Sequence, residues 1–361
     1  MKNSSRSQKN LLLFGLFVLS AVFFFLAKFI PSREAGLLRE EMIAASQVMS
    51  DAAALLRECR EAKNLPIDLS SDVNRTGIIG VESSAITTTL GSLEAKRTTT
   101  NPNFAGLVVS LLRKAGVRHG DAVAIGASGS FPGLIVAVLS AAKTMDLVPL
   151  FQVSLGASQW GANHPDFHWL QMQACLEKRG ILPFRPIALS MGGDQDTGQD
   201  MPEEGRDLLV AALEDGGFPV IRENSLQANV ASRMRSYFRE ASGREIKAFV
   251  NIGGSWANLG IDSAILHIRP GLGKISRFPS VEKQGVLFTM AAQNIPVIHL
   301  LYVKGLVQEY GLPWDPVPLP EPGEGRLYDR MVEEQPSFLA LSAVYLVLFA
   351  AGAVFGMKRS I

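Results

Sequence analysis

Asp121-Ala122-Val123-Ala124-Ile125-Gly126-Ala127-Ser128-Gly129-Ser130 is the stretch that decides the fold. A short apolar run ends there in small residues, and Phe131 to Lys143 follows at once with helical spacing. A short, nearly continuous apolar run is typical of a strand that is buried on both faces of a parallel sheet. The sequence therefore predicts a strand, a Gly/Ser turn at its carboxyl end, and a helix.

The same order recurs on both sides of this stretch. A helix is predicted before it, from about Asn103 and with an amphipathic segment at Ala105 to Ala115. Further strands are predicted at Gly77 to Val81, Leu147 to Val153, Phe184 to Leu189, Pro219 to Ile221, Lys247 to Ile252 and Pro296 to Tyr302. Further helices are predicted at Asp166 to Lys178, Pro202 to Leu213, Leu226 to Ala241 and Val286 to Ala292. The alternation favours an α/β domain with a Rossmann-like, mostly parallel sheet and helices on both faces.

Four Gly/Ser clusters follow the predicted strands. Ligands of such sheets bind outside the carboxyl ends of the strands, and each cluster stands at one of those ends. Tight turns use glycine in any case, so the argument depends on the four clusters together. Backbone N–H groups, hydroxyls and helix N-termini suit a carboxylate or a phosphate. The predicted ligand-binding residues are Gly126, Ser128, Gly129, Ser130, Gly156, Ser158, Gly192, Gly193, Asp194, Gly253, Gly254 and Ser255.

Two more features belong near this predicted cleft. The run Glu94 to Pro102 contains Lys96, Arg97 and three threonines, and it is either an anion contact or a solvated loop with a helix cap. Trp160 and Trp256 each follow a Gly/Ser cluster, which places an aromatic ring near the mouth of the cleft or packed on the sheet.

Catalytic motifs are incomplete in this chain. Ser128 or Ser130 is a weak candidate nucleophile, since the turn begins like a nucleophile elbow but has Ser130 where that motif needs glycine. The candidate bases are His164 and His168. There is no GxGxxG, Walker A or HExxH pattern, so no cofactor is predicted.

No metal site is predicted either. The spacing His164-x-Asp166-x-His168 is compatible with a chelate, but Pro165 makes Asp166 the better candidate for a helix N-cap. Asp194-Gln195-Asp196-Thr197-Gly198 is either a carboxylate pair for acid/base work or a solvated Asx turn, and the turn is favoured.

Apolar stretches at both ends are long enough to cross a bilayer. Leu11 to Ile30 contains only Lys28 as a charge, and Phe338 to Met357 contains none. About 20 apolar residues match the hydrocarbon thickness. The first stretch is read as an uncleaved anchor, because a small-x-small cleavage site does not follow it. The two tails are basic, so both termini are predicted to be cytoplasmic and the central domain extracytoplasmic.

This gives an ordered set of expected segments. They are a tail at 1–10, a transmembrane helix at 11–30, a membrane-proximal amphipathic helix at 31–64, the α/β domain at 65–311, a stiff Pro-rich tether at 312–336, a second transmembrane helix at 337–357 and a tail at 358–361. With 361 residues, a net charge of +1 and no dense basic patch, the composition gives no support for a nucleic-acid partner.

A heptad-like stripe runs along the membrane-proximal helix. Its members are Leu38, Met42, Ala45, Met49, Ala52, Leu56 and Cys59. The stripe packs either on its own domain or against a second copy, as a homodimer through 38–59. Cys59 and Cys175 can pair in an oxidising compartment, and a Cys59-linked dimer is the alternative.

Val123 to Gly133 and Ser154 to Asn163, in a chain with an anchor at each end, resemble the poly-gamma-glutamate system protein family of the bacterial envelope. The resemblance implies a process and a location but no catalytic residue. The expected function is thus that of an accessory protein of the bacterial cell membrane, which contacts polymer or the membrane subunits of a synthase and export system. An extracytoplasmic serine hydrolase or transferase, and a receptor for a small anion, are the alternatives.

Overall fold

The computed structural model describes residues 13–25, 33–333 and 336–358. It divides into two compact units, one made of Met1–Glu40 with Arg326–Ile361 and the other of Glu41–Gly325. The long helix α2 (Arg33–Ala62) contributes residues to both units. The larger unit holds the sheet and is described first.

Seven strands form one sheet in the order β4-β3-β2-β1-β5-β7-β6. All neighbouring pairs are parallel except β6 with β7, so the predicted mostly parallel α/β sheet is confirmed. The chain moves outward from β1 through β2, β3 and β4 and then returns to the other side of β1 with β5. The topological switch point therefore lies between β1 and β5. The strands are β1 (Ala122–Ser128), β2 (Val148–Ser154), β3 (Ala188–Ser190), β4 (Val220–Ile221), β5 (Ile246–Ile252), β6 (Gly271–Gly273) and β7 (Val297–Leu300).

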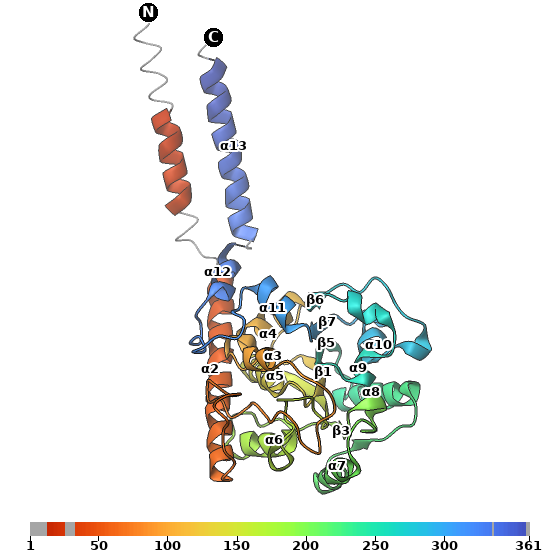
Figure 1. Cartoon of the computed structure of the whole chain (residues 1–361). Coiled ribbons are helices and arrows are strands. Elements are labelled where there is room, and N and C mark those ends of the chain that lie inside the picture. Colours follow the sequence, from red (N-terminus) through yellow and green to blue (C-terminus); the bar gives the residue numbers. More distant parts are fainter. Residues whose placement is uncertain (1–12, 26–32, 334–335, 359–361) are drawn as a thin grey trace, which may run out of the picture. The chain divides into compact units, whose positions relative to one another are not determined.

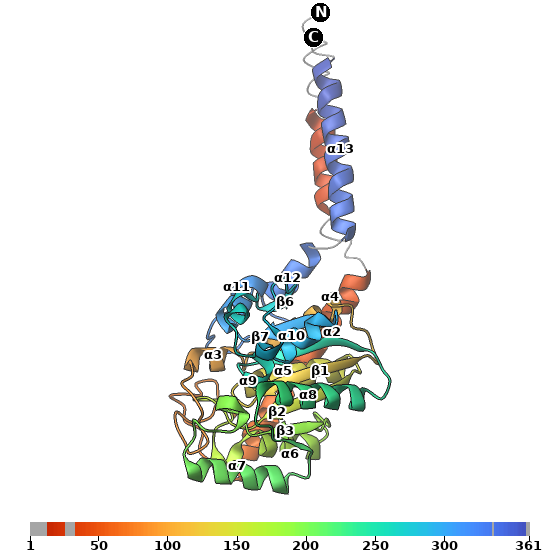
Figure 2. The same ribbon diagram turned by 90° about the vertical axis from the view of Figure 1, so that its right-hand side faces the viewer.

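Helices cover both faces of this sheet, with α4 and α5 on one side and α8 and α10 on the other (Figures 1 and 2). Their positions agree with the predicted helices to within a few residues. The helices of the larger unit after α2 are α3 (Leu93–Thr98), α4 (Asn103–Lys114), α5 (Pro132–Thr144), α6 (Trp169–Lys178), α7 (Glu203–Asp215), α8 (Leu226–Ala241), α9 (Trp256–Leu259), α10 (Val286–Ala292) and α11 (Val303–Tyr310).

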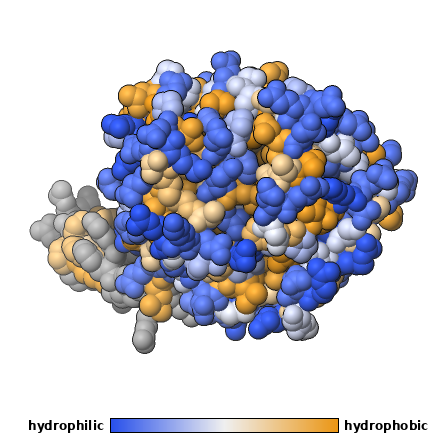
Figure 3. All heavy atoms as spheres, turned by 90° about the horizontal axis from the view of Figure 1, so that it is seen from below, coloured by the Kyte–Doolittle hydropathy of each residue, from blue (hydrophilic) through white to orange (hydrophobic). Residues whose placement is uncertain are grey.

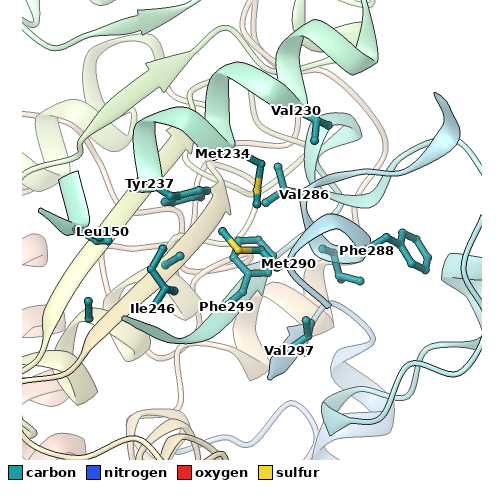
Figure 4. Close-up of a cluster of buried hydrophobic side chains, with 14 of the residues drawn as sticks. Leu150, Val230, Met234, Tyr237, Ile246, Phe249, Val286, Phe288, Met290 and Val297 are labelled. Atoms are coloured by element: carbon teal, nitrogen blue, oxygen red, sulfur yellow. The ribbon is translucent and has the colours of Figure 1, made fainter. Parts of the chain in front are cut away.

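A core of buried apolar side chains joins β1, β2, β5 and β7 to α8 and α10 (Figure 4). Tyr237 is its polar member, and its hydroxyl donates a hydrogen bond to the Ile125 carbonyl at 2.9 Å. The ring of Tyr237 meets Phe249 edge to face, with centroids 6.1 Å apart. This contact fixes α8 over the middle of β1 and β5, the two strands at the switch point.

The heptad stripe of α2 packs on its own domain. Met42, Ala45, Met49, Ala52 and Leu56 are completely buried within the chain. Of the two alternatives for the stripe, packing on its own domain is therefore the one that the structure shows for these side chains, and a homodimer through 38–59 stays a prediction. A disulfide joins Cys59 of α2 to Cys175 of α6, which is the intramolecular alternative of the two.

Two predicted segments differ from the structure. Gly77 to Val81 forms no strand, because its backbone pairs elsewhere: the Arg60 guanidinium donates to Ile79 O, and Gly80 N–H donates to Trp160 O. The segment predicted as a stiff Pro-rich tether, 312–336, belongs to the larger unit as far as Gly325. Asp315 forms an ion pair with Arg97 of α3, and its N–H donates to Thr98 Oγ1.

The smaller unit contains a helix over residues 13–25, the start of α2, α12 (Arg326–Glu333) and α13 (Pro336–Lys358). Ser20 and Tyr345 join the first and last of these helices through a hydrogen bond of 2.9 Å. Within the described residues, a helix with the length and apolarity needed to cross a membrane is not found. The predicted span 11–30 lies outside the described residues at 11–12 and 26–30, as do the tail residues 1–10 and 359–361.

The surface of the larger unit is mixed in character. On the face that Figure 3 presents, hydrophobic residues are interspersed with hydrophilic ones.

Candidate functional site

A pocket of about 440 Å³ lies at the carboxyl ends of β1, β2, β3 and β5. It therefore occupies the crevice beside the switch point between β1 and β5, where ligands of open α/β sheets bind. Its volume is within the range of small-molecule sites. One wall comes from the loop Thr88 to Ser92 and from α3, and the remaining wall comes from the turns after the four strands.

Most of the predicted ligand-binding residues line this pocket. Nine of them do so, namely Ser128, Ser130, Gly156, Ser158, Gly192, Gly193, Asp194, Gly254 and Ser255. The structure thus brings these nine residues together, because the carboxyl ends of parallel strands share one edge of the sheet.

The other three predicted glycines are structural. Gly126 lies inside β1, where an added Cβ would come within 2.6 Å of the Asn258 side chain. A Cβ on Gly129 would lie 2.7 Å from the Leu155 carbonyl oxygen. Gly253 has a φ of 78°, which favours glycine. These positions need the absence of a side chain for packing and turn geometry, and they are not among the residues that line the pocket.

Lys96 also lines this pocket, although the strand-end clusters did not predict it. It lies on α3, a short helix capped by Ser92 Oγ, and it is 3% exposed. Its ammonium contacts Ser158 Oγ at 2.7 Å, the carbonyl oxygen of Ser130, and the ring of Phe131, whose centroid lies 3.9 Å away. The predictive signal was the run Glu94 to Pro102, which is helical here as far as Thr98.

The buried ammonium of Lys96 lacks an acidic partner among the described residues. Burial alone lowers the pKa of Lys96 to about 7, because taking the charged form out of water is costly. At neutral pH the residue is therefore close to the point where it loses its proton. A negative charge placed beside it would restore the ammonium form.

Three serines line the pocket with this lysine, and Ser158 contacts it directly. Ser128 Oγ donates to Ser130 Oγ at 3.0 Å, and Ser130 Oγ also accepts the N–H of Ser158 at 3.0 Å. The turns after β1 and β2 are joined by these bonds, so their hydroxyls are held in fixed positions on the pocket wall. Each hydroxyl can donate to a ligand or accept from one.

A second cation, Arg233 of α8, is buried near the carboxyl ends of β2 and β3. Its guanidinium donates to Asp196 Oδ2 at 2.8 Å and to Ser190 Oγ. The other oxygen of Asp196 accepts the Gly192 N–H at 2.8 Å, and Asn229 donates to Oδ2 at 2.9 Å. We call Asp196, Arg233, Asn229 and Ser190 the Arg233 cluster. It holds the turn Gly192 to Asp196, which forms part of the pocket wall.

The segment Asp194 to Gly198 is neither the carboxylate pair nor the wholly solvated Asx turn that the sequence analysis considered. Asp196 is 6% exposed and ion-paired, which excludes a wholly solvated turn. Asp194 is exposed and lines the pocket, and its N–H donates to Asp200 Oδ1 at 2.9 Å. The two carboxylates of the segment therefore have separate roles, and they do not form an acid/base pair.

The predicted histidine bases lie elsewhere. His164 Nδ1 accepts the N–H of Asp166 at 3.1 Å, and His168 Nδ1 accepts the N–H of Leu170 at 3.3 Å. These imidazoles act as the helix caps, so the prediction of Asp166 as N-cap is wrong. Burial lowers the pKa of His168 to about 4. Neither histidine lines the pocket, and no metal-ligand group is found within the described residues.

Apolar surface is also present in the pocket. Phe131, Trp256 and Leu301 contribute to its lining, and Leu90 stands at the loop wall with 85% of its surface exposed. Trp256 is thus at the pocket as predicted, whereas Trp160 is not among the lining residues.

No family model, no curated protein and no solved structure matches this chain. The chemistry of the site is accordingly read from its own residues. A pocket with one buried, unpaired ammonium, several hydroxyls and some apolar wall can bind an organic anion.

Proposed function

We propose that this chain is a membrane-anchored accessory protein of bacterial poly-gamma-glutamate synthesis or export, and that its α/β domain binds carboxylate groups in the pocket beside Lys96. The observation that carries the binding role is the buried ammonium of Lys96 without an acidic partner. The resemblance of Val123 to Gly133 and Ser154 to Asn163 to the envelope family supports the choice of polymer.

The physical argument is one of missing charge. A buried ion is costly unless a partner of opposite charge compensates it. A ligand carboxylate beside Lys96 supplies that charge, and the hydroxyls of Ser130 and Ser158 are placed to donate hydrogen bonds to the same group. Each unit of a γ-linked glutamate chain carries one free α-carboxylate, so the polymer offers suitable groups along its whole length.

Membrane anchoring is the second part of the proposal. It is supported by the apolar stretches Leu11 to Ile30 and Phe338 to Met357 and by the basic tails beside them. We place the α/β domain outside the cytoplasm and expect membrane subunits of the synthase or export system as partners. An impermeant protease added to intact cells should cleave the α/β domain; full protection until the cells are broken would contradict this placement.

Binding is tested with the purified full-length chain in detergent and oligo-γ-glutamate at low salt. Titration calorimetry should show binding that weakens as salt is added, because exposed charges are screened. Lys96→Met should reduce the affinity about tenfold or more, since a hydrogen bond to a charged group contributes about 1.5–3 kcal/mol. Lys178→Met, an exposed lysine of α6, is the matched control. No binding by the wild type at low salt would remove the polymer from the proposal.

A second candidate function is favoured by one distance. Lys96 Nζ lies 2.7 Å from Ser158 Oγ, and the pKa of Lys96 of about 7 makes a neutral amine accessible. A neutral lysine can accept the serine proton and activate Ser158 as a nucleophile for amide or ester cleavage. In this second candidate Ser158 and Lys96 take the roles of nucleophile and base, which the sequence analysis gave to Ser128 and a histidine. A fluorophosphonate probe that labels the wild type but not Ser158→Ala would support this hydrolase or transferase, whereas an unlabelled wild type would exclude it.

A further inference from the structure

We infer that the pocket selects a ligand that carries an ammonium group as well as a carboxylate. This rests on the proposed function, and it names the part of the polymer that enters: the amino-terminal end of a γ-glutamyl chain, which alone has a free amine. The inference comes from the presence of one cation, Lys96, and two carboxylates, Asp194 and Asp200, in the lining of the same pocket.

Asp194 and Asp200 form one acidic wall. The backbone N–H of Asp194 donates to Asp200 Oδ1 at 2.9 Å, and this bond holds the two residues together. Both residues are exposed, and within the described residues neither forms an ion pair with a lysine, arginine or histidine. Their carboxylates therefore line the pocket without a cationic side chain paired to them in the described part of the chain.

A ligand with negative charge alone binds this pocket less favourably than one that also carries an ammonium. It gains from Lys96 but meets two like charges at the acidic wall, and like-charge juxtaposition disfavours a partner. A ligand whose ammonium reaches Asp194 and Asp200 while its carboxylate reaches Lys96 makes both contacts favourable. The pocket thus has the charge pattern of a site for an amino acid or a short peptide.

The register of the sheet gives an estimate of how far apart the strand ends near Lys96 and Asp194 lie. Ser128, Ser154 and Ser190 are aligned neighbours at the ends of β1, β2 and β3. Lys96 contacts the turns after β1 and β2, and Asp194 follows β3, and the ends of these strands are one to two strand spacings, roughly 5–10 Å, apart. One or two amino-acid units span such a distance. Phe131, Trp256 and Leu301 provide apolar surface for the methylene groups between the charges.

The test compares two ligands that differ only in the amine. The full-length chain in detergent is titrated with γ-glutamylglutamate and with its N-acetylated form. The wild type should bind the free-amine ligand about fivefold more tightly, which is the upper end for an exposed ion pair. The double variant Asp194→Asn/Asp200→Asn should lose this preference. Asp207→Asn, which removes an exposed carboxylate of α7 outside the pocket, is the matched control and should retain it.

The outcomes separate this inference from the proposed function. Equal affinities for the two ligands, both reduced by Lys96→Met, would overturn the inference and leave carboxylate binding intact. A preference that persists in the double aspartate variant would also overturn it, since the amine would then be recognised elsewhere. Absence of binding by either ligand would contradict both.

Discussion

Two buried cations near the same edge of the sheet have opposite surroundings. Arg233 is enclosed with Asp196, Asn229 and Ser190, which together use its donors. Lys96 is nearly as buried, but its neighbours are a hydroxyl, a carbonyl oxygen and an aromatic ring, with no carboxylate among them. The difference teaches that the charge of Arg233 is compensated within the fold, whereas that of Lys96 is not, and the proposed ligand site rests on this contrast.

The largest expected effect comes from breaking the Arg233 cluster. Arg233→Leu would leave Asp196 buried without its cation, and loss of one partner of a buried pair costs about 3–5 kcal/mol. The free energy of unfolding, measured by urea titration, should fall by that amount. Arg222→Leu, which breaks the exposed pair with Glu214, is the control and should change it by less than about 1 kcal/mol. A loss as small as the control would contradict a structural role for the cluster.

Lys96 should respond to pH in a way that an ordinary lysine does not. Its pKa is about 7 in the folded chain and ordinarily 10.5, so the unfolded chain binds more protons between these values. The free energy of unfolding of the wild type should therefore rise between about pH 7 and pH 10.5, by on the order of 5 kcal/mol relative to Lys96→Met. Urea titrations of both proteins across this interval measure the difference. Parallel pH profiles would mean that the lysine is not destabilised when charged.

Ligand affinity should also depend on the protonation of Lys96, but it should fall as the pH rises. A carboxylate favours charged Lys96, so binding of oligo-γ-glutamate should weaken about tenfold from pH 6 to pH 8 as the free protein loses that proton. Calorimetry at the two pH values tests this. If the affinity of the wild type were the same at both pH values, binding would not depend on the charge of Lys96.

The smallest effect is expected at Ser158. Ser158→Ala removes one neutral contact of Lys96, so affinity should change by only about threefold under the binding proposal. Under the hydrolase alternative the same variant should abolish any turnover of the polymer, followed by chromatography of its products. The two readouts on one variant thus separate a binding site from a catalytic one.

Much of the fold was predictable because its signals are local. The helices α8 and α10 begin and end where the sequence placed them, since their apolar spacing and flanking turns are clear. The prediction of a strand at Gly77 to Val81 was wrong because an apolar run is also compatible with an extended segment outside the sheet. Here the backbone of that segment bonds to the Arg60 guanidinium. The short α3 was missed because its polar surface shows no amphipathic period.

The site divides in the same way. The strand-end serines were predictable from topology, because parallel strands bring their carboxyl ends together. The contact between Lys96 and Ser158 joins residues 62 positions apart, and the bond between Asp196 and Arg233 joins residues 37 positions apart. Such pairings depend on how α3 and α8 pack on the sheet, which no local pattern encodes. The two histidines were expected as bases from their position in the sequence. In the structure each bonds a backbone N–H two residues away, and neither reaches the pocket.

The central claim is that Lys96 is a buried ammonium whose counter-charge comes from the ligand. Nitrogen-15 NMR of the Lys96 side chain, followed through a pH titration with and without γ-glutamylglutamate, measures its pKa in both states. We predict a pKa near 7 in the free protein, as burial dictates, and a clear rise when the ligand is bound. An ordinary lysine value in the free protein, or no change on binding, would contradict the account.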